Sequence, residues 1–377
     1  AEAAANDQGS AGDIVVTAQK RSEKLNDVPM AITAATGEAL VSQGITQVSQ
    51  LARIEPSLQF SPSNNGTPVY TIRGVGYFEQ SLSATPAVSL YQDEVPFTYP
   101  VMTRGAMMDV ERVEILKGLQ GTLYGQNATG GLINFIAARP TDSFEAGVQA
   151  SLARFNSTIL NGFVSGPLSS TVSARLAVQT EHGGAWQRSV TRNDRLGDKD
   201  TNIARLLLDW KPTDNFTARL NVNGWTDRSE TQAGQLVGFR FLSPQYISPV
   251  TAAQQSDPRS YLPNPAYLAA GIYPAGIARL LQNPIPPRNN RAADWDVGTH
   301  PRADQNYFQT SLRLEYETAG GVTLTSLTAY QRFRQNDQRD IDGVDVNDQF
   351  YIIDGKVDSV FQELRAGGDL GQDRKST

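Results

Sequence analysis

The side chains that most often carry catalysis are scarce in this chain. It has no cysteine and only two histidines, His182 and His300, among its 377 residues. A thiolate nucleophile, a disulfide framework and a multi-histidine metal site are therefore excluded. The nucleophile motif G-x-S-x-G is absent, and both histidines lie in predicted loops. The sequence gives little support to an enzyme, and we expect neither a catalytic residue nor a cofactor.

A glycine-rich segment at residues 118–131 is the next place where the backbone itself could bind something. A phosphate-binding P-loop needs Lys-Ser or Lys-Thr after its glycines, and no such pair follows here. The G-x-G at residues 74–76 lacks the third glycine of a dinucleotide site. We therefore interpret these glycines as turns or points of close backbone approach. The predicted turn residues are Gly74, Gly118, Gly121, Gly125, Gly130 and Gly131.

Closely spaced aspartates occur once, at residues 340–348. Carboxylates at this spacing can hold calcium, which takes about six to eight oxygen ligands. The spacing of an EF-hand is absent, so a solvated loop is the favoured interpretation. Whether the loop binds calcium stays open, and no metal ligand is assigned.

Composition and hydropathy restrict the class of protein further. The formal net charge is -6, so the basic excess of a nucleic-acid-binding surface is missing. No stretch approaches the ~18 to 20 consecutive apolar residues of a membrane-spanning helix. Membrane β-barrels stay open, because only every second residue of their strands faces lipid.

The first part of the chain is a leader, residues 1–18, which is small and polar apart from one β-prone run at residues 14–17. This composition is too poor in apolar side chains to order itself, so we expect the leader to be flexible. Its β-prone run, which has no obvious partner nearby, suits addition to the sheet edge of another protein. By spacing alone, an ordinary first strand of the next domain is the favoured reading.

The second part, residues 19–140, is predicted to be a small α+β domain. We expect helices at residues 37–43 and from Thr46 to before Pro56, and a helical turn at residues 108–111. Strands are expected at residues 69–73, 87–91, 113–116 and 132–137.

The third part, residues 141–377, shows a clear alternation of apolar and polar residues, as in Phe216-Thr-Ala-Arg-Leu-Asn-Val222. Period two with one charged face predicts half-buried strands. Short turns separate them on one side, whereas a long connection at residues 230–304 lies on the other. This asymmetry favours an outer-membrane barrel over a soluble β-sandwich. Eight strands are expected, near residues 145–155, 158–166, 171–182, 201–211, 215–227, 305–317, 321–334 and 357–366.

Several motifs carry a resemblance to a known family. The run Asp13-Ile-Val-Val-Thr-Ala18 is similar to the TonB box of TonB-dependent outer-membrane receptors. The second part resembles their plug domain through Thr71-Ile-Arg-Gly74 and, most specifically, Asp109-Val-Glu-Arg-Val-Glu-Ile-Leu-Lys-Gly118. Two departures affect turns: Leu119 stands where the family usually has proline, and Glu94 where it usually has glycine.

The resemblance implies an α+β plug domain inside an antiparallel transmembrane β-barrel of about 22 strands. It implies TonB-dependent active transport of a scarce, large solute across the outer membrane of a Gram-negative bacterium, with a ferric siderophore as the first expectation. Carbohydrate, cobalamin or another organic nutrient is the alternative ligand within the family. A passive porin or a surface-binding protein is the alternative from another class. Expected partners are outer-membrane lipid, a small-molecule ligand and the ExbB-ExbD-TonB complex.

The resemblance also assigns roles to residues of this sequence. Docking to TonB as an added strand is expected from Asp13, Ile14, Val15, Val16, Thr17 and Ala18. Ion pairs that fix the plug to the barrel wall are expected from Arg73, Glu111, Arg112 and Glu114. Ligand contacts at the outward-facing side are expected from Tyr77, Phe78, Gln80, Phe97, Tyr99, Met102 and Arg104.

Residues 141–377 are too short for such a barrel, which at ~10 residues per strand plus connections needs on the order of 500 residues. An open sheet edge is costly in lipid, because unpaired backbone groups lack hydrogen bonds there. We therefore expect an amino-terminal portion of the barrel. The remaining strands are expected on a second chain or on a continuation of this one.

Overall fold

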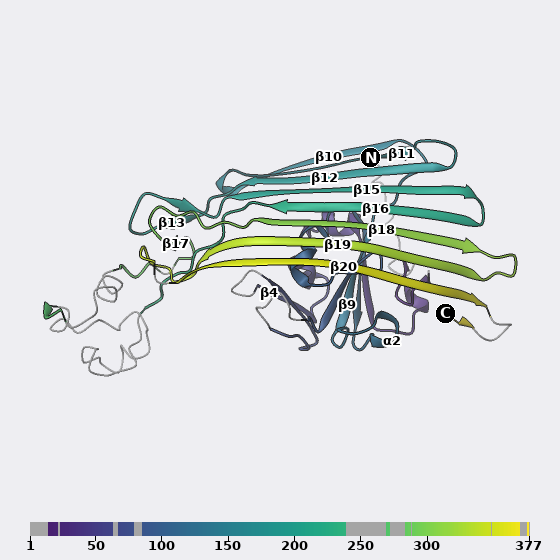
Figure 1. Ribbon diagram of the computed structural model, residues 1–377, viewed down its shortest axis with the longest axis horizontal. Helices are drawn as coiled ribbons and strands as arrows, with labels where there is room; N and C mark the ends of the chain where they lie inside the picture. The colour runs from purple at the N-terminus through teal and green to yellow at the C-terminus, as the bar shows by residue number, and fades with distance from the viewer. Residues whose placement is uncertain are drawn as a thin grey trace, which may run out of the picture.

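The computed structural model describes residues 14–21, 23–62, 67–78, 85–238, 269–271, 283–287, 289–347, 349–369 and 375–376. Two sheet systems dominate. A wide antiparallel sheet forms a curved wall, and a smaller mixed domain lies against its concave face (Figure 1). No helix among the described residues is long and apolar enough to cross a membrane.

The smaller domain, which we call the plug, is built on a five-stranded sheet of order β3-β8-β9-β6-β7. In this sheet β6 and β9 run parallel, and the other neighbours are antiparallel. The strands are β3 (Ile32–Thr36), β6 (Val88–Gln92), β7 (Val95–Pro96), β8 (Val110–Lys117) and β9 (Gly131–Ala137). Two hairpins accompany it: β1 (Val15–Val16) with β2 (Glu23–Lys24), and β4 (Leu58–Pro62) with β5 (Pro68–Ile72).

The plug sheet is buried at its centre, where every residue of β9 is buried and Asn134 is the strand's single polar side chain. Ile115, Ile133 and Phe135 are fully buried. Short helices cover the sheet, and the side chain of Thr36 caps α1 by accepting a hydrogen bond from the Ala39 amide. The helices are η2 (Leu25–Asp27), α1 (Gly37–Ser42), η3 (Val48–Arg53), η4 (Pro100–Gly105) and α2 (Gly121–Tyr124).

One local prediction for the plug is wrong, and another is correct except for a cap that is displaced by one residue. The expected helical turn at residues 108–111 gives way to β8 from Val110, because pairing with β9 extends the strand. The expected helix after Thr46 is the 3-10 helix η3, which is capped reciprocally by Gln47 and Gln50. The turn chemistry was present in the sequence, but one residue later than predicted.

The wall contains all eight expected strands. They are β10 (Glu145–Ala153), β11 (Ser157–Pro167), β12 (Val172–Gly183), β15 (Lys199–Thr213), β16 (Phe216–Asp227), β18 (Gln305–Glu317), β19 (Thr323–Asp340) and β20 (Phe350–Asp369). The short strand β21 (Lys375–Ser376) pairs with the end of β20. Within the described residues the sheet stays open, with β10 and β21 at opposite ends of the strand order.

The wall strands place their polar residues on the inner face and their apolar residues on the outer face, which is the reverse of a soluble sheet. In β16 the polar residues Asn221, Asn223 and Asp227 are buried toward the plug, whereas Leu220 and Val222 on the other face are half-exposed. A soluble sheet would place its apolar face on the core. Polar residues inside and apolar residues outside are typical of a membrane barrel.

Short turns join the strands at the right-hand side of Figure 1, and the long connections lie at the left. We call these the turn side and the loop side. On the loop side a small sheet, absent from our predictions, is formed by β13 (Gln187–Ser189), β14 (Arg195–Leu196) and β17 (Ala292–Ala293). Its strands of two or three residues are too short for a period-two pattern to reveal. A 3-10 turn, η5 (Arg154–Asn156), joins β10 to β11.

Candidate functional site

The segment expected to dock to TonB is held against the plug. Val16 and Ala18 are fully buried, whereas Val15 is 46% exposed. The segment forms β1 and pairs with β2, so the expectation that no partner strand lies nearby is wrong. The pairing was hard to foresee because β2 is only two residues of ordinary polar sequence. Asp13, the first residue of the expected box, lies outside the described residues.

A buried carboxylate fixes the end of this segment. The amide of Thr17 donates to Oε1 of Glu114 at 2.9 Å, and the Thr17 hydroxyl lies 3.1 Å from both carboxylate oxygens. Arg112 donates to the same carboxylate at 2.8 Å. Burial raises the pKa of Glu114, against the opposing effects of Arg112 and the Thr17 hydrogen bonds. Tyr124 closes the arrangement by donating to the carbonyl oxygens of Thr17 and Ala18.

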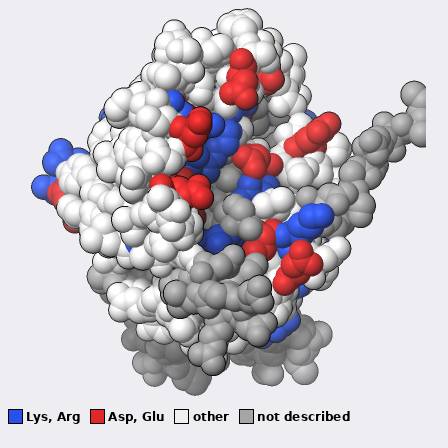
Figure 2. Space-filling model, turned by 90° about the vertical axis from the view of Figure 1, so that its right-hand side faces the viewer, with Lys and Arg blue, Asp and Glu red and all other residues white. Residues whose placement is uncertain are grey.

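The same segment is tied to the wall. Lys20 pairs with Glu363 of β20 at 2.5 Å, and Arg365 donates to the carbonyl oxygen of Lys20. These contacts lie at the turn side, where Figure 2 shows acidic and basic side chains interspersed, with no large patch of one sign.

The predicted plug-to-wall ion pairs are wrong in their partners. Arg112 pairs with Glu111 and Glu114 inside the plug, and Arg73 is an exposed residue of a turn. Glu111, Arg112 and Glu114 lie on one strand, β8, at adjacent and alternate positions, so Arg112 pairs with its neighbours on that strand.

Other residues join the plug to the wall. The pairs are Glu94 with Arg313 at 2.8 Å and with Arg365 at 2.7 Å, Asp109 with Arg175 at 2.5 Å, and Arg104 with Asp227 at 2.6 Å. Their wall partners occupy plug-facing positions of strands, which an alternation count could have identified.

Glu94 has an unusual backbone. It follows Asp93 in the two-residue turn between β6 and β7, and both residues have positive φ, 49° for Asp93 and 70° for Glu94. Glycine is preferred at such positions because a side chain is strained there. The carboxylate of Glu94 compensates by reaching two arginines of the wall while only 4% of the residue is exposed. The turn residue noted as a departure from the family is therefore an anchor.

Most of the predicted glycine turns are present. Gly74, Gly118, Gly125 and Gly131 have positive φ. At Gly130 a Cβ atom would approach the carbonyl oxygen of Val75 to 2.9 Å, so close backbone approach explains it. Gly121 instead begins α2 and has open space around it, so the expectation of a required turn there is wrong.

The residues expected to contact ligand divide into two groups. Tyr77 and Phe78 are 57% and 59% exposed, and Arg104 is exposed beside the ring of Trp225. Phe97 and Met102 are buried in the hydrophobic core, where they cannot reach a solute in this arrangement. Met102 also accepts a hydrogen bond from the Trp225 indole through its carbonyl oxygen. Tyr99 is half-buried. Gln80 lies outside the described residues.

Charged side chains also line a cavity of about 220 Å³ between plug and wall. They include Arg112 and Arg139 from the plug and Arg219 and Glu315 from the wall. The interface is therefore polar, and it leaves room for water beside its ion pairs.

The aspartate-rich segment differs from the solvated loop that we expected. Asp340 is only 1% exposed, and Asp342 is half-buried. Among the described residues, no three acidic or imidazole side chains are gathered closely enough to hold a metal ion. Asp348 lies outside the described residues.

Comparison with known proteins places this geometry in a class. The family described as TonB-dependent Receptor Plug Domain matches residues 24–132. The pesticin receptor of Yersinia pestis is 32% identical over 222 residues, which cover 56% of this chain and 32% of that protein. An iron-regulated outer membrane virulence protein of Vibrio cholerae is 27% identical over 177 residues, 44% of this chain and 27% of that protein.

Solved structures share the fold. The ferric yersiniabactin uptake receptor FyuA from Yersinia pestis superposes with a TM-score of 0.69 at 21% identity, covering 92% of this chain and 46% of that one. The pyoverdine outer membrane receptor FpvA from Pseudomonas aeruginosa gives a TM-score of 0.69 at 15% identity, covering 98% and 48%. The chain thus spans about a third of the length of the curated relatives and just under half of these solved chains.

The fold is a plug packed inside part of a β-barrel wall. Residues 24–132 match the plug domain of TonB-dependent receptors, and the described part of the chain shares the fold of the solved receptors.

Proposed function

We propose that this protein takes part in TonB-dependent uptake of a ferric siderophore across the outer membrane of a Gram-negative bacterium. The observation that carries the proposal is the plug seated on the polar, concave face of a wall whose other face is apolar. A wide barrel would leak unless its lumen were filled, and a plug fills it. The relatives named for iron regulation, yersiniabactin and pyoverdine support the ligand class.

The ligand surface is proposed to include the exposed members of the predicted set, Tyr77, Phe78 and Arg104. Aromatic rings and a guanidinium suit an organic chelate with polar edges. Phe97 and Met102 support this surface from the core and are not proposed as contacts.

Coupling to TonB is proposed to use residues 13–18 as an added strand. In the structure Val16 is buried and the segment is paired with β2, so strand addition requires the segment to leave the plug. Its hydrogen bonds each contribute only about 0.5–1.5 kcal/mol net. Release is therefore within reach of a modest pulling force.

Uptake by iron-starved cells tests the function. The protein is expressed in its own outer membrane, and cells are given ⁵⁵Fe-labelled siderophores, labelled cobalamin and a labelled oligosaccharide, with and without TonB. We expect uptake of at least one ferric siderophore and its loss when TonB is deleted. Uptake that survives the deletion would indicate a passive pore, and uptake of cobalamin or sugar alone would contradict the ligand class.

Two substitutions separate docking from coupling. Val16→Pro deletes a strand donor and fixes φ, so we expect surface binding of the siderophore without uptake. Thr17→Val keeps a β-branched side chain but loses the hydroxyl contacts to Glu114, so uptake should persist. Normal uptake by Val16→Pro would contradict strand addition by this segment.

A further inference from the structure

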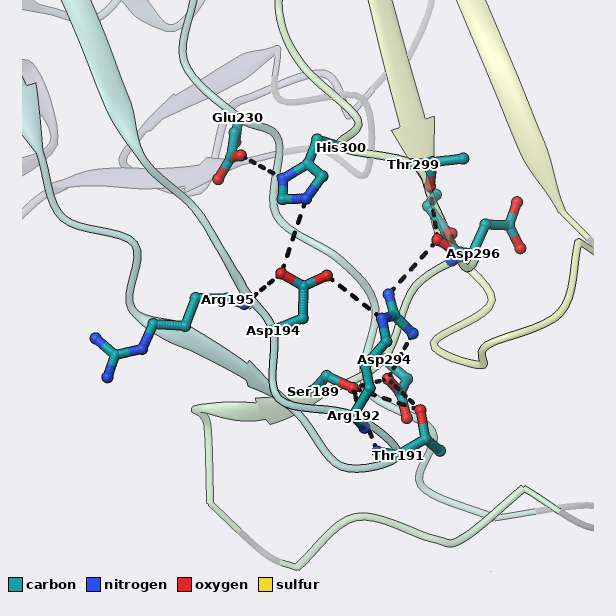
Figure 3. A network of polar contacts seen from close by, with 11 residues as sticks. Ser189, Thr191, Arg192, Asp194, Arg195, Glu230, Asp294, Asp296, Thr299 and His300 are labelled. Atoms are coloured by element: carbon teal, nitrogen blue, oxygen red, sulfur yellow. Dashed lines mark hydrogen bonds and ion pairs between the residues drawn. The ribbon is translucent and has the colours of Figure 1, made fainter.

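Three segments of the loop side meet beyond the end of β19. They are the β13–β14 connection at residues 190–194, the segment at residues 294–300 after β17, and the segment at residues 340–347. Trp295 is fully buried there with Leu196 and Ala233, and the guanidinium of Arg192 lies over its ring at 4.8 Å. We call this arrangement the rim cluster. Figure 3 shows its arginine and several of its carboxylates.

Asp296 is a buried carboxylate that forms no ion pair with a cation among the described residues. Only 3% of the residue is exposed, and neither carboxylate oxygen has a hydrogen-bond partner among the described residues. Arg192 is the nearest cation, but it donates to Asp194, Asp294 and the backbone carbonyl oxygen of Asp296. In Figure 3 the carboxyl group of Asp296 points away from Arg192. A buried charge in this position is costly unless something neutralises it.

Asp340 is the second buried carboxylate. Its Oδ2 accepts a hydrogen bond from the amide of Asp296 at 2.7 Å, and its Oδ1 has no donor among the described residues. The side chain of Asp342 lies within hydrogen-bonding reach of Asp340. Because two ionised carboxylates repel each other, a hydrogen bond between them requires a proton.

The proton belongs on Asp340. Both oxygens of Asp342 already accept backbone amides, from Val344 at 2.9 Å and from Gln349 at 2.8 Å. These bonds favour the ionised form of Asp342. Protonated Oδ1 of Asp340 would then donate to Asp342, while its Oδ2 keeps the amide of Asp296. A single proton on Asp340 therefore lets both of its carboxyl oxygens take part in a hydrogen bond.

Among the described residues near Asp340, few cations are available to neutralise an ionised Asp340. The loop segment contributes Asp294 and Asp296, and the segment after β19 contributes Asp342 and Asp345. On β19 itself, Arg339 is paired with Asp337 at 3.1 Å. Arg192, from the β13–β14 connection, faces three carboxylates: Asp194, Asp294 and Asp296. Acidic groups therefore outnumber the cations among the described residues that face the cluster.

Asp340 also lies clear of any membrane. A transmembrane strand needs about 9–11 residues. β19 has 18 residues, and Asp340 is its last, at the loop side. The group is thus on the part of the wall that projects beyond the bilayer.

We propose that a proton held between Asp340 and Asp342 latches the rim cluster, joining the segments at residues 294–300 and 340–347 and releasing them when it is lost. The bond to the Asp296 amide carries the connection between segments. Deprotonation leaves two adjacent carboxylates beside a third buried one, and their repulsion separates the segments.

The direction of the pH dependence follows from the burial of Asp340. Burial, with the charges of Asp342 and Asp296, raises the pKa of Asp340 to about 7. A carboxyl group whose pKa is higher in the closed state than in the open state binds the proton on closing. The closed cluster therefore gains stability at low pH and loses it as pH rises toward and through about 7.

Hydrogen exchange on the intact protein tests the latch. Peptides covering residues 290–300 and 338–347 are followed by mass spectrometry at pH 5.5 and pH 8.5, with exchange times scaled for the intrinsic rate. We expect protection to be on the order of tenfold higher at pH 5.5, since each pH unit above the raised value changes proton occupancy about tenfold. Equal protection at both pH values would overturn the proposal.

Asp340→Asn is the decisive variant. Asparagine has the same shape, can accept from the Asp296 amide and donates permanently to Asp342. We expect high protection at both pH values. The matched control is Asp198→Asn, an exposed aspartate of the same side, which should keep the wild-type dependence. A dependence that persists in Asp340→Asn would refute the assignment to Asp340.

Two further arms keep the test decisive. If Asp340→Asn does not fold, Asp342→Asn serves, because removing its charge should move the transition to lower pH. Wild-type protein is also measured at pH 8.5 with EDTA and then with CaCl₂. Protection restored by calcium would overturn the proton in favour of a cation site.

Discussion

Two buried carboxylates in different regions of the molecule show opposite behaviour. Glu55, at the end of η3 in the plug, is 5% exposed and accepts bonds from Lys117 at 2.9 Å, Thr33 at 2.6 Å and Ser57 at 2.6 Å. Burial alone would raise the pKa of Glu55, but these bonds outweigh it and lower the pKa to about 2. Asp340 in the rim cluster is buried more completely and is not paired with any cation in the part of the chain that the structure describes, and its pKa is raised to about 7.

The difference shows that burial alone does not decide whether a carboxyl group is ionised in this protein. The hydrogen-bond donors around the carboxyl group decide it. Glu55 ties η3 to β3 and β8, and its contribution to stability is present above its ordinary pKa of 4.5 and lost as pH falls toward 2. Asp340 contributes below its ordinary value of 3.8, and the contribution is lost as pH rises through about 7. Acid should therefore loosen the plug and tighten the rim.

The largest effect is expected where a paired carboxylate is removed from the plug-to-wall interface. Glu94→Gln leaves Arg313 and Arg365 without their shared partner, with their side chains only 18% and 14% exposed. Removing one member of a buried pair costs about 3–5 kcal/mol. The measurement is the urea concentration that releases the plug, followed by hydrogen exchange in β6 and β7.

Two variants sharpen that result. Glu317→Gln changes an exposed glutamate at the end of β18 and should cost almost nothing. Glu94→Gly also loses both ion pairs but relieves the positive φ, so it should be less harmful than glutamine by roughly 1 kcal/mol. A Glu94→Gln variant as stable as the Glu317→Gln control would show that the ion pairs do not anchor the plug.

The next largest effect is expected from a substitution that leaves Glu55 of the plug without a cation, as Asp340 is in the described part of the rim cluster. Lys117→Met removes the cation of Glu55 but keeps the length of the side chain. A hydrogen bond to a charged group contributes roughly 1.5–3 kcal/mol, so the plug should lose about that much at neutral pH. The pKa of Glu55 should rise, moving acid destabilisation to higher pH. Urea unfolding between pH 3 and 8 measures both, with exposed Lys211→Met as the control. An unchanged pH profile would contradict the role of Lys117.

A smaller effect is expected from a substitution beside Asp340 in the rim cluster. Asp296→Asn removes one neighbouring charge from Asp340 and keeps the backbone amide that donates to it. The pKa of Asp340 should fall, moving the transition in hydrogen exchange on the order of one pH unit lower. Asp198→Asn again provides the exposed control. A transition that stays in place would show that Asp296 does not act on Asp340.

The comparison also explains what the sequence could predict. Period-two patterning located all eight long wall strands, because successive side chains of a strand point to opposite faces of the sheet. Motif resemblance located the plug and, at residues 24–132, agrees with the family match. Both signals are local in the chain.

These sequence patterns did not predict contacts between segments that lie far apart in the chain. Glu94 meets Arg313 across 219 positions, and Asp296 meets Asp340 across 44. The spacing of Glu111, Arg112 and Glu114 allows ion pairs within β8, but the family resemblance assigned these charges to the wall. The sequence predicted a solvated loop at residues 340–348 for the same reason, since the contact of Asp340 with residues 294–300 depends on the small sheet of very short strands.

The smallest expected effect tests whether neutral donors matter to Glu55. The Thr33 hydroxyl donates to Glu55 at 2.6 Å and accepts from Lys117 at 3.1 Å. Thr33→Val keeps the branched shape suited to β3 and leaves Lys117 and Glu55 in contact. We expect a loss of about 1 kcal/mol at pH 7 and a smaller loss at pH 3, because protonated Glu55 depends less on the donor. Thr328→Val, at an exposed hydroxyl of β19, is the control in the same urea titration. If Thr33→Val cost as much at pH 3 as at pH 7, the hydroxyl would be supporting β3 itself, and Lys117 with Ser57 would account for the ionised state of Glu55.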